Sequence, residues 1–182
     1  MLYFIFINTG YACLLYNRMT ISGWNRLMVC FACCGLVVFY MVSCKKDATP
    51  PEGRLLPEIK DSVNLLRSRG CRCGADSMPP APPLTWNAQL GAAAEAHAKD
   101  MYDNNYFSHI SPQGSSPIQR AQAVGYTGSY VGENIAKGYA TTGDVMTGWR
   151  QSEAHCKAMM DTLYKEMGAY EYGGYWVQEF GR

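Results

Sequence analysis

The acidic residues of this 182-residue chain begin only at Asp47, and this partition constrains the fold more than any single motif does. All 15 Asp and Glu residues follow Cys44, together with 14 of the 16 Lys and Arg residues. An acid-free, apolar start that carries only Arg18 and Arg26, followed by a body of balanced charge, is typical of a targeting segment joined to a domain. The partition therefore predicts one globular domain behind an export segment.

The composition excludes two classes of protein. Hydrophobic residues make up 48% of the chain, which is enough to bury a core and argues against intrinsic disorder. The formal net charge is only +1, and the basic residues form no stripe along one segment. The electrostatic footprint of a nucleic-acid-binding protein is therefore missing, and we expect no nucleic-acid partner.

The export segment contains an uncharged run over residues 27–42, which follows Arg26. Its 16 residues are short for a membrane span, which needs about 20, and they fit the apolar core of a signal peptide. The next residues, Met41-Val42-Ser43-Cys44, resemble a bacterial lipobox, in which the cysteine is lipidated and becomes the mature N-terminus. The alternative is an uncleaved membrane anchor with an incidental cysteine. A second apolar stretch over residues 1–18 has no role in such a signal, and Met19 would be a sensible start.

Composition divides the chain into three parts. We expect an N-terminal extension and lipoprotein signal peptide over residues 1–43, a flexible tether over 44–57 and a folded domain over 58–182. Within that domain, four prolines between Pro79 and Pro83 predict an extended connection between two helices.

Hydrophobic periodicity predicts the elements of the domain. Apolar steps of three and four predict a helix from about residue 57 to Gly70 and a longer one from Trp86 to Met101. Two further helices are expected over about 142–152 and 155–163. The aromatic segments on either side of Gly173-Gly174 predict a β-hairpin over 167–181. Helices early and strands late indicate an α+β fold or a layered α/β/α sandwich.

The three histidines differ in context. His97 lies on the apolar face of the second helix, which favours a core histidine bonded to backbone. His109 lies in a turn-rich loop, and His155 lies where two helices meet, and such positions more often carry function. Ser108 is the one hydroxyl beside a histidine, and a turn residue is its ordinary interpretation.

Several separated motifs occur together in one order. They are Leu84-Thr85-Trp86-Asn87, His97-Ala98-Lys99-Asp100-Met101, Phe107-Ser108-His109, Arg120 with Gly125-Tyr126, Gly132-Glu133-Asn134-Ile135-Ala136, Trp149 with Ser152, His155 and Met160, Met167-Gly168, and Tyr175-Trp176-Val177-Gln178-Glu179-Phe180-Gly181. From about residue 58 to the C-terminus the chain resembles the CAP superfamily of cysteine-rich secretory proteins, antigen 5 and pathogenesis-related class 1 proteins, in its bacterial SCP-like form. The resemblance implies an α-β-α sandwich with a central antiparallel sheet.

The resemblance also implies a cleft lined by two histidines and two acids. His109 and His155 match the histidines, and Glu133 matches the first acid. The family position of the second acid is occupied by Ser152, and Glu153 is its neighbour, rotated by about 100° if the segment is helical.

Two imidazoles and a carboxylate permit two kinds of chemistry. His109, His155 and Glu133 can hold a divalent metal such as zinc with an open position for water. They can equally form a hydrogen-bond network in which Glu133 fixes the histidine tautomers. We assign no catalytic residue, because no separate nucleophile is evident, and keep these three and Glu153 as cleft candidates.

The resemblance also gives the cysteines of the domain a role. It implies a disulfide between Cys73 and Cys156, which leaves Cys71 over. The alternative is that Cys71 and Cys73 bind a metal as a pair. A disulfide between these two cysteines would close a ring across one intervening residue, which would be strained.

Three functions fit these observations. The first is a non-enzymatic envelope module whose cleft binds a metal, a small apolar ligand or a partner protein. The second is a metal-dependent, peptidase-like hydrolase that uses the same cleft. The third is a structural filler of the cell envelope. In each case the membrane is reached through a lipid at Cys44, and Lys45 after it favours the outer membrane or the cell surface.

Overall fold

The computed structural model describes residues 5–7, 11–13, 28–31, 37–40 and 50–182. The chain divides into two compact units, Met1–Thr49 and Pro50–Arg182, and each is described by itself. The first unit contains β1 (Ile5–Ile7), β2 (Tyr11–Cys13), β3 (Met28–Phe31) and β4 (Val37–Tyr40), which form one antiparallel sheet in that order. The predicted lipidation site Cys44 lies outside the described residues. Among the helices of the described part, none is long and apolar enough to cross a membrane.

The second unit carries five helices and seven strands in its described residues. In chain order they are β5 (Arg54–Leu55), α1 (Pro57–Arg69), β6 (Cys71–Cys73), β7 (Asp76–Met78), β8 (Thr85–Trp86), α2 (Ala88–Asp103), α3 (Pro117–Ala123), β9 (Val131–Lys137), α4 (Thr142–Gln151), α5 (Glu153–Met160), β10 (Glu166–Tyr172) and β11 (Tyr175–Gly181).

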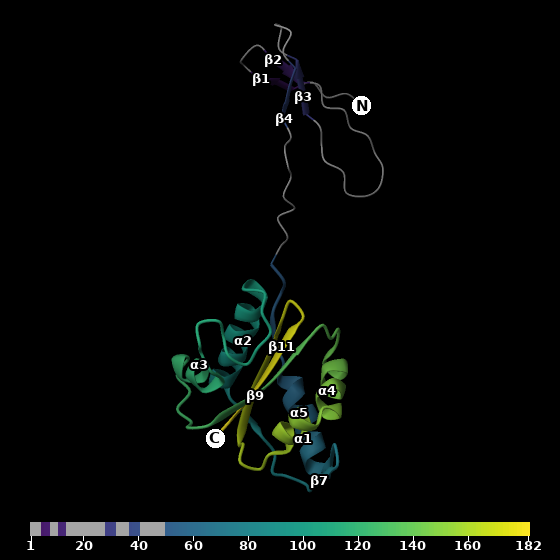
Figure 1. The fold of residues 1–182 in the computed structure, drawn as a ribbon, viewed down its shortest axis with the longest axis vertical. Coiled ribbons are helices and arrows are strands. Elements are labelled where there is room, and N and C mark those ends of the chain that lie inside the picture. Colours follow the sequence, from purple (N-terminus) through teal and green to yellow (C-terminus); the bar gives the residue numbers. More distant parts are fainter. Residues whose placement is uncertain (1–4, 8–10, 14–27, 32–36, 41–49) are drawn as a thin grey trace. The chain divides into compact units, whose positions relative to one another are not determined.

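A central sheet separates two layers of helices. Its strand order is β5-β10-β11-β9 with antiparallel neighbours, and the short β8 pairs with β10 in parallel. Helices α2 and α3 lie on one side of this sheet, and α1, α4 and α5 lie on the other (Figure 1). The predicted α+β class and its α-β-α sandwich are therefore confirmed.

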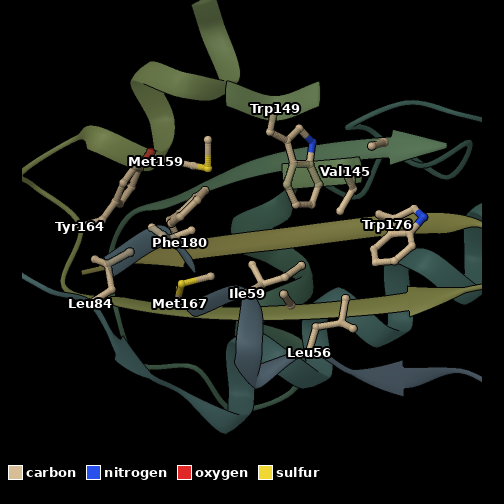
Figure 2. Close-up of a cluster of buried hydrophobic side chains, with 13 residues drawn as sticks. Leu56, Ile59, Leu84, Val145, Trp149, Met159, Tyr164, Met167, Trp176 and Phe180 are labelled. Carbon is tan, nitrogen blue, oxygen red and sulfur yellow. The ribbon is translucent and has the colours of Figure 1, made fainter. Parts of the chain in front are cut away.

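The pleat of β11 gives each layer its own core, because successive side chains of a strand point to opposite faces. Trp176 and Phe180 pack with α1, α4 and α5, in a cluster that includes Ile59 and Trp149 (Figure 2). Tyr175 and Val177 pack with Ala94, Ala98 and Met101 of α2 on the opposite face. All seven residues of β11 are buried, so this strand is the centre of the domain.

The helix ends follow general capping rules, and the proline and glycine expected at the ends of the first helix are found there. Helix α1 has a proline in its first turn and ends at Gly70, whose φ of 68° is one that glycine adopts without cost. Asn87 caps α2 by accepting hydrogen bonds from the backbone N–H groups of Gln89 and Leu90. The hairpin around Gly173-Gly174 is also confirmed.

Three details differ from the sequence-based expectation. Trp86 lies in strand β8, and α2 begins only after its Asn87 cap. Strand β5 lies inside the segment predicted as a tether, and the next residue, Leu56, is fully buried. Strand β9 and helix α3 were not expected from the sequence. The folded unit therefore begins before residue 58, because β5 completes the sheet edge beside β10.

A buried arginine holds the proline-rich connection in place. Arg67 of α1 is fully buried and donates hydrogen bonds to Pro82 O at 2.6 Å, Met159 O at 2.8 Å and Asp161 O at 2.9 Å. Burial lowers the pKa of its guanidinium, and the charge of Asp161 opposes that shift. This one side chain joins α1, the extended connection and the end of α5.

Candidate functional site

Two carboxylates face each other across neighbouring strands. Glu133 in β9 lies directly opposite Glu179 in β11. Both share a sheet face with Ile135 and Val177, which pack on the α2 side. Their side chains are 1% and 0% exposed, so two like charges would meet out of water. Such a pair requires a nearby cation, a proton, or both.

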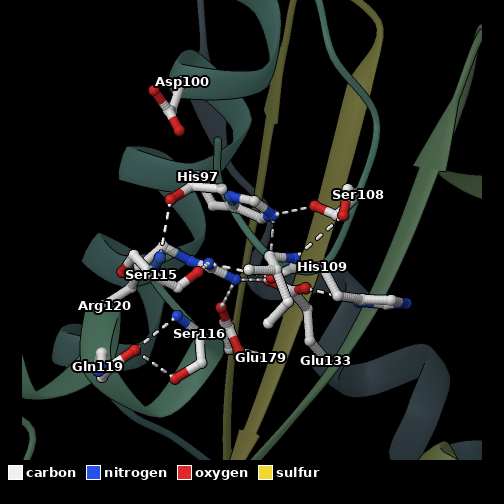
Figure 3. A network of polar contacts seen from close by, with 12 residues as sticks. His97, Asp100, Ser108, His109, Ser115, Ser116, Gln119, Arg120, Glu133 and Glu179 are labelled. Atoms are coloured by element: carbon white, nitrogen blue, oxygen red, sulfur yellow. Dashed lines mark hydrogen bonds and ion pairs between the residues drawn. The ribbon is translucent and has the colours of Figure 1, made fainter. Parts of the chain in front are cut away.

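Arg120 of α3 supplies the cation. Its Nη2 lies 2.6 Å from Glu133 Oε2 and 4.0 Å from Glu179 Oε1 (Figure 3). Its Nη1 donates to the backbone oxygens of His109 at 3.1 Å and Ser115 at 2.8 Å. Arg120 therefore connects the two strands to the loop that carries His109.

Glu133 is the carboxylate that holds the negative charge. Its Oε1 accepts a hydrogen bond from His109 Nδ1 at 2.7 Å, and its Oε2 lies 3.6 Å from His97 Nε2. Burial alone would raise the pKa of Glu133, but the His109 hydrogen bond and the charges of His97 and Arg120 hold it below its ordinary value.

Glu179 has the opposite titration behaviour. Burial raises its pKa well above the ordinary carboxyl value, and the charge of Glu133 adds to the shift, while Arg120 opposes it. Its carboxyl oxygens accept no hydrogen bond from a donor among the described residues, and its hydrogen bond with Glu133 also raises its pKa. A proton on Glu179 removes the repulsion between the strands. The pair therefore carries one negative charge against the charge of Arg120.

His97 confirms the core interpretation that its sequence position favoured. It is fully buried, and its Nε2–H donates to the backbone oxygen of Ser108 at 3.0 Å. Burial lowers the pKa of its imidazole, and the charge of Glu133 opposes that shift. Ser108 is the turn residue that was expected, since its Oγ accepts a hydrogen bond from the backbone N–H of Ile110. His97 thus fixes the loop just before His109.

His109 is the exposed end of the network. Half of its side chain is accessible to solvent. Because Glu133 is an acceptor, His109 Nδ1 must carry a proton, and in the neutral form of the ring this leaves the lone pair of Nε2 free. An imidazole backed by a carboxylate in this way is held in one orientation and one tautomer. His109 is therefore positioned to accept a hydrogen bond or to bind a metal.

His155 approaches from the other helical layer. It lies in α5, and its backbone oxygen accepts a hydrogen bond at 3.2 Å from Asn134 of β9, the neighbour of Glu133. Burial lowers the pKa of its imidazole, and the charge of His109 lowers it further. The two predicted cleft histidines therefore act on each other at the β9 edge of the sheet, and His155 tends to be neutral.

Glu153 points elsewhere. Its carboxylate lies against Gly74 and pairs with Lys157 Nζ at 2.6 Å. Lys157 also binds Asp76 of β7 at 2.6 Å. This former candidate for the second acid is therefore engaged at the β6–β7 hairpin, because its place in the first turn of α5 turns it toward that hairpin.

The site contains two members whose role the sequence did not indicate, Arg120 and Glu179. Both occur in the motifs that carried the family resemblance, but neither was assigned to the cleft. A signal was present at Glu179, because it is the one charged residue of a strand that otherwise contains only aromatic and apolar residues, Gln178 and a glycine. Only the register of β9 against β11 shows that it meets Glu133.

The predicted three-ligand metal site is only partly assembled. Among the described residues, the one set of three potential ligands whose atoms lie within 4.8 Å of one another is Cys71, Cys73 and Cys156. His109, Glu133 and His155 form no such set, and Arg120 and His109 already occupy both oxygens of Glu133. The described residues therefore form no ready three-ligand centre at these positions, and Glu133 stands behind His109 as its hydrogen-bond partner.

The cysteines follow the pairing that the resemblance implied. Cys73 and Cys156 form a disulfide with a Cα–Cα distance of 5.4 Å, and Cys71 is a free thiol. The bond joins β6 to α5 one residue after His155. The disulfide therefore fixes the helix that carries the second cleft histidine.

Two curated relatives from Bacillus subtilis (strain 168) match part of the chain. The uncharacterized protein YkwD is 37% identical over 100 residues, which is 54% of this chain and 39% of its own. The uncharacterized membrane protein YlbC is 34% identical over 97 residues, which is 53% of this chain and 28% of its own. The matching segments thus span well under half of either relative.

Solved structures give the same fold. An extracellular protein of Bacillus anthracis that contains an SCP domain matches with a TM-score of 0.62 and 33% identity, over 69% of this chain and 39% of that one. An outer surface protein of Borrelia burgdorferi matches with a TM-score of 0.60 over 72% of this chain and 98% of its own, but at 19% identity it shows only the fold.

The family comparison covers most of the second unit. Residues 60–180 match CAP, described as the cysteine-rich secretory protein family. This range includes His97, His109, Glu133, His155 and Glu179. Since the match extends over more than half of the 182 residues, the chain belongs to the CAP family.

Proposed function

We propose that this protein is an exported, lipid-anchored module of the bacterial cell envelope whose cleft binds a small ligand or a partner through His109 and His155, without catalysis. One observation carries the proposal. Glu133 is buried and already engaged by His109, Arg120 and His97, so its role is to orient His109 and not to exchange protons with a substrate. The accessible chemistry of the cleft then belongs to the two imidazoles.

Export is supported from two directions. The apolar run before Cys44 has the length of a signal peptide, and relatives of the fold include an extracellular protein and an outer surface protein. A disulfide in the folded unit also suits an oxidising compartment.

The lipid anchor is tested by the Cys44→Ser substitution, which replaces the cysteine sulfur with oxygen. Cells that express the full chain are grown with labelled palmitate, and the Cys44→Ser variant is compared with the unmodified chain. Lipidation predicts that the unmodified chain carries the label and that the variant does not. An uncleaved anchor predicts that neither chain is labelled, which would remove the lipid from the proposal.

The cleft is tested by native mass spectrometry of the full chain extracted from cells in mild detergent. We expect a bound species on the unmodified chain that the double change His109→Ala with His155→Ala removes. Glu153→Gln is the matched control, because this residue adjoins His155 in sequence but pairs with Lys157. The same added mass on all three chains, or no added mass on any of them, would contradict the proposal.

A second function, a metal-dependent hydrolase, is favoured by one observation. His109 carries its Nδ1 proton toward a carboxylate, which is the arrangement of most metal-binding histidines. A divalent ion, if bound, would supply a polarised water, but the incomplete ligand set gives no basis for deriving a step through it. Titration of the full chain with Zn²⁺ tests this alternative. Absence of binding at micromolar concentration rejects it, whereas binding that His109→Ala abolishes, together with peptide hydrolysis, would replace the first proposal.

A further inference from the structure

The free thiol of Cys71 lies beside the Cys73–Cys156 disulfide, outside the hydrogen-bond network around Glu133. Cys71 Sγ lies 3.7 Å from Cys73 Sγ and 3.7 Å from Cys156 Sγ. The free thiol is therefore in van der Waals contact with both sulfur atoms of the disulfide, and either of them could be attacked by its thiolate. No role for Cys71 follows from the family fold or from the proposed function.

Local structure explains this meeting. Cys71 and Cys73 are two residues apart in β6, so their side chains share one face of the strand. The strand pairs with β7 in a short hairpin, and Cys156 of α5 packs against that face together with Met160 and Ala81. Because the hairpin and the helix hold all three cysteines, the sulfur contacts do not depend on a flexible segment.

The three sulfurs differ in access. Cys73 and Cys156 are fully buried, whereas Cys71 is partly exposed and lines a cavity of about 370 Å³ between α1 and α4. Leu66 and Met146 form apolar parts of its wall. The cavity leaves the Cys71 side chain space to change its rotamer beside the two sulfurs that it already contacts.

We propose that Cys71, Cys73 and Cys156 form a thiol–disulfide exchange centre. In the step, the Cys71 thiolate attacks Cys156 Sγ, a bond forms between these two sulfurs, and the Cys73–Cys156 bond breaks. Cys73 leaves as the thiolate and takes up the proton that Cys71 lost. The numbers of thiols and disulfides do not change, so the step requires no outside oxidant or reductant.

The direction of attack follows from the strand. A bond between Cys71 and Cys73 would close a ring across the single residue Arg72, which is strained in an extended chain. A bond between Cys71 and Cys156 joins two separate elements, as the present disulfide does. Exchange therefore moves the crosslink by two residues along β6 while Cys156, next to His155, remains bonded.

Burial of the Cys71 thiol affects the rate of the exchange. It raises the pKa of the Cys71 thiol, and the positive charge of Arg150 opposes this shift. Arg69 and Arg150 both line the cavity on which Cys71 opens. The thiolate is the attacking species, so exchange is slow near neutral pH and faster in alkaline solution.

The sequence makes the exchange measurable by mass. Trypsin cuts after Arg69, Arg72 and Lys157, so the three cysteines fall on three different peptides, separate from those of the first 44 residues. The full chain is held at pH 8, quenched in acid, unfolded under mildly acidic conditions with excess maleimide, and digested. We expect the single label to be divided between Cys71 and Cys73, with a crosslinked pair of Cys71 and Cys156 peptides. Label on Cys71 alone, or on Cys156, would overturn the proposal.

Single substitutions give a second, independent measurement. We expect Cys73→Ser to retain a crosslink, now between Cys71 and Cys156, and to keep a higher melting temperature than Cys156→Ser, which removes the shared partner. Cys71→Ser is the matched control and should retain the Cys73–Cys156 bond with no label at Cys73. Two free thiols in a folded Cys73→Ser chain, or equal melting temperatures for Cys73→Ser and Cys156→Ser, would overturn the proposal.

Discussion

At the scale of single residues, two identical side chains acquire opposite properties from their surroundings. Glu133 and Glu179 face each other in register, yet one has a lowered pKa and the other a raised one. The difference lies in their surroundings, because Glu133 accepts hydrogen bonds from His109 and Arg120, while Glu179 is fully buried beside the Glu133 carboxylate and accepts none from a described donor. Glu133 and Arg120 form a buried ion pair, and Glu179 is a protonated acid beside them. The two carboxyl groups are therefore not two competing charges.

This assignment predicts different outcomes for the same chemical change. Glu133→Gln leaves Arg120 buried without its carboxylate and should lower the free energy of unfolding by about 3 kcal/mol at pH 7. Glu179→Gln imitates the protonated acid, so we expect no loss at pH 7. Chemical denaturation of both variants and of the unmodified chain measures these values. Equal losses for the two changes would contradict the assignment.

The raised pKa of Glu179 also predicts a pH dependence. The folded chain keeps this proton at pH values where the unfolded chain, with an ordinary carboxyl pKa near 4.5, has lost it. Stability from this residue therefore falls as the pH rises above about 4.5. Glu133 has the reverse sign, since its lowered pKa gives stability that is lost as the pH falls. We expect Glu179→Gln to melt with a smaller drop between pH 5 and pH 8 than the unmodified chain. A parallel pair of curves would contradict this.

At the scale of elements, the contact between α2 and β10 places His97 over the sheet. A Cβ atom at Gly168 of β10 would lie 2.1 Å from the backbone nitrogen of Gly91 in α2. Glycine is needed there because the two backbones touch, and no side chain can move aside. The close approach brings His97 within reach of Glu133.

The contact predicts a large effect for a single methyl group. Gly168→Ala should lower the free energy of unfolding by about 3 kcal/mol, because α2 must move away from the sheet. Gly143→Ala in α4 is the matched control, since the nearest atom to its new Cβ is 3.7 Å away and alanine favours a helix. Thermal unfolding of both variants measures the difference. A Gly168→Ala chain as stable as the control would show that the two backbones do not pack this closely.

At the scale of the whole molecule, the folded unit begins before the part that resembles the family. Strand β5 pairs with β10, and Leu56 is fully buried in the core on the α1 side. Residues 54–57 therefore belong to the domain and not to the tether that the sequence predicts over 44–57.

This boundary predicts the outcome of two truncations. A chain of residues 50–182 should unfold cooperatively, because this unit is compact by itself. A chain of residues 58–182 lacks β5 and Leu56 and should be less stable by about 2 kcal/mol, the cost of exposing one leucine. Calorimetry compares the two. Equal melting temperatures for the two chains would show that the domain begins at residue 58.

The sequence by itself determined the local structure and the residue types of the site. Proline and glycine at the ends of α1, the Asn87 cap and the Gly173-Gly174 turn depend on neighbouring residues, so their signals can be read locally. The family resemblance added His109, Glu133 and His155 and the disulfide of Cys73 and Cys156. The prediction placed Trp86 in the second helix because its spacing fits the helical pattern. In the structure Trp86 lies in β8, since the Asn87 cap starts α2 after it.

Only the tertiary structure decided which of these groups act on one another. Glu179 joins Glu133 through the register of β9 and β11, which are far apart along the chain. Glu153 is turned away because one step along α5 directs it to Lys157. Cys71, left over by the pairing, lies beside the disulfide because β6 and α5 pack together. Contacts between distant segments follow from sheet register and helix rotation, and these have no signature in a single sequence.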